Sequence, residues 1–334
     1  MILQEEFSKV IMVKFFFTLY SLFAVVVSAI LYLIAAYLKK NGEKLAYKVT
    51  RILICVLLAP VILGIASYEY ARYIEPKWIT VSHISVKSPY FNPELKNIKI
   101  VQVSDLHITE VGLREERFIK AVNALKPDLL IITGDFVNNK KGFRPCAEVL
   151  ATIHKPRYGI IGILGNHDTY FINEDKIVSF LNKAGVVVLR YGLAKVDFGN
   201  AGRLWLVGIS NDYGAKVRYG DPSYLIKAFE TAPCNEPKIL LVHQPEVVDS
   251  LKYVVCKPQL VLAGHTHGGQ FGISFLRKYS GYAERSKYMA GWFTVEGVPL
   301  YVNRGIGVIT RSIRFFAPPE VTVVRLAHSS ADSS

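Results

Sequence analysis

Between residues 103 and 267 the chain reads VSDLH (103–107), TGD (133–135), GNHD (165–168), VH (242–243) and GHTH (264–267). Each of these five segments carries side chains that bind metal ions, and each follows an apolar run typical of a buried strand. Polar residues at the carboxyl ends of neighbouring strands meet at one edge of a sheet, so we expect a single site. The candidate ligands are Asp105, His107, Asp135, Asn166, His243, His265 and His267.

The ligand types indicate which metals the site would bind. Carboxylate, amide oxygen and imidazole without a thiolate favour manganese, iron, zinc or magnesium over a cysteine-bound zinc, and manganese is our first expectation. Seven ligands are too many for one ion. We therefore expect two divalent ions about 3.5 to 4 Å apart that share a carboxylate. Asp135, in the second segment, is the expected bridge.

The strength of this prediction lies in the joint pattern. A lone DxH, GD or VH is more often a turn or a strand edge than a functional site. GNHD and GHTHGG are richer, and the flanking Gly264, Gly268 and Gly269 let the backbone turn sharply around an ion. All five segments in order, each behind an apolar strand, are hard to attribute to chance.

The order DxH, GD, GNHD, H and GHxH resembles the calcineurin-like metallophosphoesterase superfamily. The continuation GHTHGGQ, followed by YVNRGIG (301–307) and APPE (317–320), is similar to its bacterial membrane-anchored branch. The resemblance covers about residues 97–327. It implies an α/β fold, a two-sheet β-sandwich flanked by helices, and hydrolysis of phosphoester or pyrophosphate bonds.

The resemblance also implies roles for individual residues. One ion would be held by Asp105, His107, Asp135 and His267. The other would be held by Asp135, Asn166, His243 and His265.

Three further residues are candidates for the chemistry. By the same resemblance, His167 faces the substrate and protonates the leaving oxygen, with Asp168 as its orienting partner; the alternative for His167 is a structural hydrogen bond. Arg304, in NRGIG, either contacts a substrate phosphate or pairs with a buried carboxylate, and the residues leave both alternatives open.

The chain divides into four regions. Residues 1–70 form a membrane region, 71–96 a linker and opening strand, 97–327 the phosphoesterase domain and 328–334 a tail. Strands alternate with helices in the first part of the domain, which favours parallel β-α units. The later strands, expected at 292–295, 300–303 and 321–326, suggest a second sheet.

The membrane region contains two apolar runs. Phe15 to Leu38 is 24 residues without a charge, enough to span a bilayer core of about 30 Å. Ile52 to Tyr68 is a second run of 17 residues, which we expect to span as well, with a buried or re-entrant helix as the alternative.

We expect a bacterial inner-membrane protein, but the side that holds the catalytic domain stays open. The loop between the runs carries more cations than either flank, which would keep it cytoplasmic and place both termini outside. That bias is modest. The loop cations are Lys39, Lys40, Lys44, Lys48 and Arg51.

The charge and the cysteine content of the chain limit the kinds of molecule that it is expected to bind. A net charge of +13 suits nucleic acid, anionic lipid or a phosphorylated substrate. No nucleic-acid module is visible and the lysines are dispersed, so we expect a bilayer and a phosphorylated, lipid-linked substrate, and no nucleic acid. Four cysteines without CxxC spacing predict neither a disulfide framework nor a thiolate site: Cys55, Cys146, Cys234 and Cys256.

The specific substrate is the least constrained property. Among membrane-associated bacterial members the chain is most similar to the chlamydial-type enzymes that hydrolyse UDP-2,3-diacylglucosamine to lipid X and UMP in lipid A biosynthesis. That reaction needs a cytoplasmic active site. The alternatives are a general extracytoplasmic membrane-anchored phosphodiesterase or phosphatase, and a non-catalytic metal-binding module.

Overall fold

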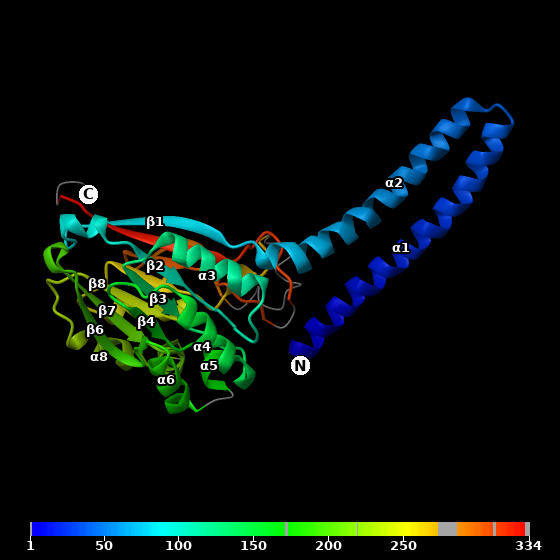
Figure 1. Ribbon diagram of the computed structural model, residues 1–334. Coiled ribbons are helices and arrows are strands. Elements are labelled where there is room, and N and C mark those ends of the chain that lie inside the picture. The colour runs from blue at the N-terminus through cyan, green and yellow to red at the C-terminus, as the bar shows by residue number, and fades with distance from the viewer. Residues whose placement is uncertain (1, 171–172, 219, 273–285, 310–311, 331–334) are drawn as a thin grey trace. The chain divides into compact units, whose positions relative to one another are not determined.

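The computed structural model describes residues 2–170, 173–218, 220–272, 286–309 and 312–330, with side chains from residue 18 onward. Part of the expected tail, residues 331–334, lies outside this range. The chain forms two compact units, Met1–Ile74 and Glu75–Ser334, each taken by itself below (Figure 1).

The first unit is a hairpin of two long helices. Helix α1 (Ile2–Lys40) and helix α2 (Lys44–Glu69) pack side by side and are joined by a short turn in which Gly42 has a φ of 78°. The segments Thr18–Lys40 and Lys44–Lys77 are long and apolar enough to cross a membrane. Most of their large apolar side chains are exposed, as lipid-facing residues would be. Both expected apolar runs lie inside these two helices.

The second unit contains two six-stranded mixed sheets packed face to face (Figure 1). The first sheet has the strand order β1 (Thr80–Ser88), β12 (Glu320–His328), β2 (Ile100–Val103), β3 (Leu129–Thr133), β4 (Ile160–Ile163) and β5 (Val186–Val188). The second has the order β10 (Gly291–Val295), β11 (Val298–Val302), β9 (Leu260–Ala263), β8 (Lys238–Val242), β7 (Arg203–Ile209) and β6 (Tyr191–Asp197). The predicted two-sheet sandwich is confirmed.

Helices cover the outer faces of both sheets. The first sheet packs against α3 (Leu113–Leu125), α4 (Phe143–Thr152) and α6 (Glu174–Lys183). The second packs against α7 (Asn211–Arg218), α8 (Ser223–Glu230) and the 3₁₀ segment η6 (Pro245–Tyr253). Central strands are therefore buried on both faces, which explains their continuous apolar runs. The shorter elements are η1 (Tyr70–Ile74), η2 (Glu75–Lys77), η3 (Pro93–Asn97), η4 (Lys140–Gly142), α5 (Asn166–Tyr170), η5 (Gly199–Ala201) and η7 (His267–Gly269).

The C-terminal strands do not all join the second sheet, which corrects the expectation from the sequence. Strands β10 and β11 do so, but β12 lies in the first sheet between β1 and β2. It pairs parallel with β1 over nine residues and antiparallel with β2 over three. This pairing fills the sheet next to the first ligand strand, and such long-range pairing is not visible in local periodicity.

The structure also corrects the prediction for cysteine. Cys234 and Cys256 form a disulfide, with their Cα atoms 5.1 Å apart. Each lies four residues before a strand, ahead of Lys238 in β8 and Leu260 in β9. Because β8 and β9 are parallel neighbours, the two preceding loops meet at the same edge of the sheet. CxxC spacing was therefore the wrong signal, and equal offsets before adjacent strands were the informative one.

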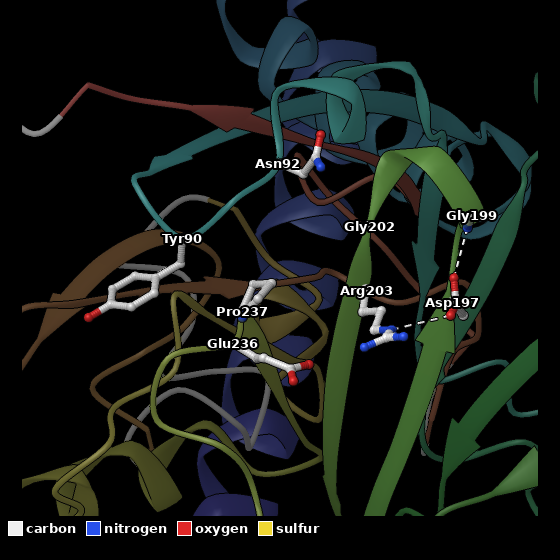
Figure 2. A pocket seen from close by; sticks show the side chains of 8 residues that line it. All are labelled: Tyr90, Asn92, Asp197, Gly199, Gly202, Arg203, Glu236 and Pro237. Carbon is white, nitrogen blue, oxygen red and sulfur yellow. Dashed lines mark hydrogen bonds and ion pairs between the residues drawn. The ribbon is translucent and has the colours of Figure 1, made fainter.

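The amino ends of β7 and β8 border a cavity of about 450 Å³ (Figure 2). Its lining includes Tyr90, Glu236 and the ion pair between Asp197 and Arg203, whose Oδ2 and Nε atoms are 3.3 Å apart. None of the candidate metal ligands lines it. The chemistry is therefore expected at the opposite, carboxyl edge of the strands.

Candidate metal centre

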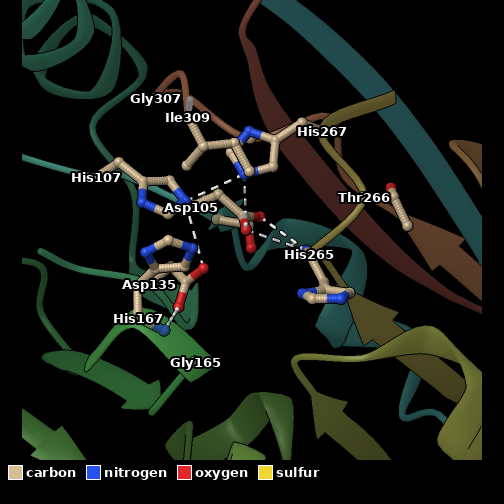
Figure 3. Close-up of polar contacts among 12 residues, drawn as sticks. Asp105, His107, Asp135, Gly165, His167, His265, Thr266, His267, Gly307 and Ile309 are labelled. Atoms are coloured by element: carbon tan, nitrogen blue, oxygen red, sulfur yellow. Dashed lines mark hydrogen bonds and ion pairs between the residues drawn. The ribbon is translucent and has the colours of Figure 1, made fainter. Parts of the chain in front are cut away.

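The structure brings all seven candidate ligands together at the carboxyl ends of five strands. Figure 3 labels five of them: Asp105, His107, Asp135, His265 and His267. Strands β2, β3 and β4 of the first sheet deliver four of them, and β8 and β9 of the second sheet deliver three. Six are buried and His265 is partly exposed. The site therefore lies where the edges of the two sheets meet.

The first group of ligand atoms joins Asp105, His107, Asp135 and His267. The Nε2 atoms of His107 and His267 are 3.1 Å apart. His107 Nε2 lies 3.3 Å from Asp135 Oδ2, and His267 Nε2 lies 3.4 Å from Asp105 Oδ1. These four side chains could hold one ion.

The second group joins Asp135, Asn166, His243 and His265. His243 Nε2 is 3.1 Å from Asn166 Oδ1, 3.2 Å from His265 Nδ1 and 3.3 Å from Asp135 Oδ2. Asp135 Oδ2 thus belongs to both groups. It occupies the position that a carboxylate bridging two ions would take.

These separations fit metal binding. Two ligands that are each 2.0 to 2.1 Å from one ion lie about 2.8 to 3.0 Å apart in octahedral geometry and about 3.3 to 3.4 Å apart in tetrahedral geometry. The observed contacts run from 3.1 to 3.4 Å. Ring nitrogens that face each other at such distances could both bind one metal ion. The donor set therefore fits two divalent cations.

The backbone around the ligands is unusual. Five of the nine described non-glycine residues with positive φ are candidate ligands. The left-handed conformation is rare for such residues and clusters at functional sites. Hydrogen bonds between loops hold it here: the N–H of Asp105 donates to Gly134 O and that of His107 to Asp135 O, both at 2.9 Å. The five ligands are Asp105 (50°), His107 (44°), Asp135 (54°), His265 (71°) and His267 (52°).

Two motif glycines are needed for space. A Cβ on Gly264 would lie 1.9 Å from Ser104 Oγ and 2.4 Å from Asp105 Oδ2. A Cβ on Gly165 would lie 2.1 Å from Asp135 Oδ1. Gly268 and Gly269, with φ of 59° and 72°, make the sharp turn expected of them. Gly264 instead permits the close approach of two ligand loops.

The electrostatics of the site also favour bound cations. Burial by itself would raise the pKa of Asp135, but His243 and His107 lower it well below its usual range. Burial would lower the pKa of His243, yet Asp135 and Asp105 raise it to about 10. Without a metal, His243 would therefore carry a proton beside the carboxylates. A divalent cation would replace that proton.

One histidine is oriented by a hydrogen bond at its other ring nitrogen. His243 Nδ1 donates to Thr133 O at 2.8 Å, which leaves Nε2 free to bind an ion. Burial, together with the charge of His243, lowers the pKa of His265 to about 3, so this ligand is neutral, as metal binding requires.

His167 lies next to the ligands and lines an adjacent cavity. Its backbone N–H donates to Asp135 Oδ1 at 2.8 Å, and its ring centroid is 4.7 Å from that of His107. Its Nδ1 is buried and has no hydrogen-bond partner among the described residues. His107, Asp135 and His167 lie close enough together that they could also hold an ion.

Asp168 does not make the expected contact with His167 within the described part of the chain. Its carboxylate instead accepts hydrogen bonds from the N–H groups of Gly165, at 2.9 Å, and Val137, at 3.2 Å. Burial and the charge of Asp135 raise the pKa of Asp168 to about 8. Asp168 thus ties the GNHD turn to the loop that carries Asp135.

Arg304 pairs with a buried carboxylate, the second of its two alternatives. Its backbone N–H donates to Glu320 Oε2 at 3.0 Å, its Nη2 lies 3.5 Å from Glu320 Oε1, and its Nε donates to Pro318 O. The neighbouring Gly305 and Gly307 pack against the first ligand loop: a Cβ on Gly307 would lie 2.6 Å from His107 Cβ. The NRGIG segment therefore supports the metal ligands.

Sequence reasoning missed a second arginine behind the site. Arg314 is fully buried and donates to the carbonyl oxygens of Arg304, Gly305, Gly307 and Ala317. Its Nη2 lies 3.4 Å from His267 Nδ1. Arg314 thus fixes the loops around His267, and no motif in the sequence indicated this role.

A cavity of about 470 Å³ opens beside the ligands. It is lined by Asp135, Asn166, His167 and His265, and by seven further residues, of which only Thr266 belongs to a metal-ligand motif. Their weak sequence signal is position, since Gln244 directly follows His243 and Glu246 lies three residues after it. The additional residues are Tyr170, Arg218, Gln244, Glu246, Thr266, Ser286 and Ile309.

The sequence pattern of the calcineurin-like phosphoesterase family matches residues 98–269, which include all seven ligands. The chain belongs to this family. The resemblance inferred from the five segments is confirmed, and the chain is a hydrolase that cleaves phosphoester bonds.

Curated relatives of this phosphoesterase share most of its length. It is 30% identical to the uncharacterized metallophosphoesterase YkuE of Bacillus subtilis over 78% of this chain and 89% of that protein. It is 27% identical to the UDP-2,3-diacylglucosamine pyrophosphatase LpxG of Chlamydia trachomatis, over 83% of this chain and 97% of that protein. A transmembrane protein with a metallophosphoesterase domain from Danio rerio is 29% identical over 78% of this chain and 60% of that protein. With the two apolar helices, these relatives indicate a membrane-anchored phosphoesterase.

Proposed function

We propose that the chain binds two divalent ions, manganese first among them, and hydrolyses a phosphodiester or pyrophosphate bond in a lipid-linked substrate. The specific candidate is UDP-2,3-diacylglucosamine, cleaved to lipid X and UMP. The observation that carries the proposal is the pair of four-ligand groups that share Asp135 Oδ2 and border a cavity.

The roles of the residues follow from their positions. Two bound cations would neutralise the phosphoryl oxygens and lower the pKa of a water that attacks phosphorus. His167, which lines the cavity and is held by its N–H to Asp135, would donate a proton to the leaving oxygen. Asp168 would position His167 indirectly, by fixing the turn that carries it.

A lipid-linked substrate is supported by exposed aromatic residues. Trp78, 56% exposed, directly follows the candidate span Lys44–Lys77. Phe316 is 63% exposed, and its N–H and that of Ala317 donate to the Glu75 carboxylate. Aromatic side chains of this kind favour the bilayer interface. The name of LpxG describes a diacylated sugar nucleotide as its substrate, and the similarity to this chain covers 97% of LpxG.

The test compares two substrates in one preparation. Detergent-solubilised chain with added Mn²⁺ is assayed on UDP-2,3-diacylglucosamine and on a generic aryl phosphodiester. We expect UMP release, lost in Asp135→Asn and kept in the exposed control Asp197→Asn. Cleavage of the aryl substrate alone would exclude the specific candidate. Protein that holds two metals but cleaves neither substrate would exclude the hydrolase.

A second candidate, an extracytoplasmic phosphodiesterase, is favoured by the disulfide between Cys234 and Cys256. Disulfides persist in oxidising compartments and are rare in the cytosol. The five cations in and around the loop between α1 and α2 favour the same placement. A C-terminal alkaline phosphatase fusion that is active in cells would support this candidate. Fluorescence from a C-terminal GFP fusion, with both cysteines reduced in cells, would support the cytoplasmic pyrophosphatase instead.

A further inference from the structure

We propose that Arg218, Gln244 and Glu246 form a subsite that binds a hydroxyl-bearing group, a sugar or nucleoside, attached to the phosphate at the metal centre. The inference rests on the proposed function and specifies its substrate class. The three residues lie outside the metal-ligand motifs.

The position of the three residues supports this assignment. They line the same 470 Å³ cavity as the ligands Asp135 and His265. Gln244 directly follows the ligand His243, and Glu246 is the second residue of η6. Arg218 comes from a different element, the last turn of α7. A substrate whose phosphate sits at the ligands would therefore extend between these side chains.

Two of the side chains have buried acceptors without partners. The Oε1 atom of Gln244 and the Oε2 atom of Glu246 are buried and make no hydrogen bond to any described residue. Gln244 is only 9% exposed. Such acceptors are costly unless a donor reaches them. The terminal torsions of Gln and Glu are broad, so either oxygen can turn towards a ligand in the cavity.

The chemistry of these acceptors selects the ligand. Ionised phosphate oxygens and acyl esters have no proton to donate, so neither would satisfy Gln244 Oε1 or Glu246 Oε2. Sugar hydroxyls and the imide N–H of a pyrimidine base are donors. Inorganic phosphate, which carries neither group, would leave both acceptors unpaired, and sites of this kind discriminate strongly against such analogues.

Arg218 supplies the complementary charge. A guanidinium presents a rigid fork of donors that suits phosphate oxygens. The same cation would repel an ammonium group, which disfavours an amino-alcohol headgroup as the partner of Glu246. A group with both an anionic phosphate and neutral hydroxyl donors matches all three side chains.

The experiment measures equilibrium binding by calorimetry on the Mn²⁺-loaded, detergent-solubilised full chain. The probes are UMP, glucose 1-phosphate, phosphoethanolamine and inorganic phosphate. We expect UMP or glucose 1-phosphate to bind at least about tenfold more tightly than inorganic phosphate. Whichever of the two shows the preference identifies a nucleoside or a sugar.

Variants test the individual roles. Glu246→Ala should reduce the preferred probe's advantage about tenfold and leave inorganic phosphate binding unchanged. Arg218→Ala should weaken all phosphate probes. The exposed pair Arg144 and Glu148 on α4 supplies matched controls, Arg144→Ala and Glu148→Ala, with wild-type binding expected. Glu246→Gln replaces Glu246→Ala if the latter fails to fold.

The results that would overturn the subsite differ from those that would overturn the proposed function. Equal affinity for all probes, preference for phosphoethanolamine, or Glu246 variants that bind like the controls would overturn the subsite. Cleavage of an aryl phosphodiester by the same preparation is read separately. If neither this substrate nor UDP-2,3-diacylglucosamine is cleaved, the proposed function is refuted, whereas cleavage without a binding preference refutes the subsite alone.

Discussion

Replacing Gly264 by alanine should empty one metal position. The φ of Gly264 is not positive, so alanine fits the backbone and the perturbation is steric. The new Cβ would lie 1.9 Å from Ser104 Oγ and 2.4 Å from Asp105 Oδ2, where ordinary contact begins at 3.4 Å. The hydroxyl must therefore retreat by about 1.5 Å and the carboxylate by about 1.0 Å.

These displacements exceed what a metal site tolerates. Ligand distances must hold to about 0.2 Å, so a carboxylate displaced by about 1 Å no longer binds its ion. Asp105 belongs to the first ligand group only, so metal content should fall from two ions per chain towards one. We expect turnover to fall about 100-fold or more. Overpacking and the loss of the Ser104 hydrogen bond to Thr133 O should cost about 1 to 3 kcal/mol of stability.

The assay combines elemental analysis of desalted protein, thermal unfolding by circular dichroism and cleavage of an aryl phosphodiester. Gly208→Ala is the control for a steric clash away from the metal site. Its Cβ would lie 2.3 Å from Leu189 Cβ and would not contact a metal ligand. It should lower Tm while metal content stays at two. Gly112→Ala, whose nearest neighbour would be 3.6 Å away, controls for the substitution itself. Two bound ions and wild-type turnover in Gly264→Ala would refute the close-approach argument.

Four further outcomes are expected. His167→Gln should lower turnover by about 10² to 10⁴ while two metals stay bound, and loss of metal would instead make His167 a ligand. Chelation with EDTA should lower Tm and added Mn²⁺ should restore it, because the ions bind the folded site. A Tm that changes with neither treatment would argue against the two-ion centre. Arg304→Ala should destabilise the chain by about 1 to 3 kcal/mol through its lost partner Glu320 and leave KM unchanged, whereas a raised KM at unchanged Tm would indicate a phosphate contact. Cys234→Ser should lower the free energy of unfolding by about 3 kcal/mol, and reduction of the wild-type protein should lower it by the same amount. Equal Tm values for the wild-type protein with and without reductant would show that the disulfide does not form.

The sequence predicted the ligand strands because burial on both faces leaves a local trace. Strands such as β3 and β8, buried at every position, read as uninterrupted apolar runs that end at a ligand. No such signal marks the edge strand β6, because six of its seven residues are partly or fully exposed. The sheet to which β12 belongs depends on its pairing with β1, more than 200 residues earlier, and no local pattern encodes that contact.

Two arginines also show that local sequence does not reveal contacts between distant parts of the chain. Arg304, in a recognisable motif, pairs with Glu320, whereas Arg218 outside any motif lines the cavity. Sequence distance to a motif does not decide which arginine lines the cavity, because that depends on how α7 packs beside the ligand strands. A motif therefore predicts metal ligands better than it predicts the other residues that line the cavity.

The left-handed backbone of five ligands explains why the motif residues need so much support from elsewhere. Each such conformation costs about 1 kcal/mol or more, so together they consume a large share of a typical folding stability of about 5 to 15 kcal/mol. Residues distant in sequence hold the loops in this conformation. Gly307 N–H donates to Asp105 O at 2.6 Å, and Arg314 donates hydrogen bonds to three carbonyl oxygens of the NRGIG loop. The ligands are therefore held in binding geometry by the fold itself. Substitutions at Gly307 or Arg314 should then loosen the metal centre although neither residue is a candidate ligand.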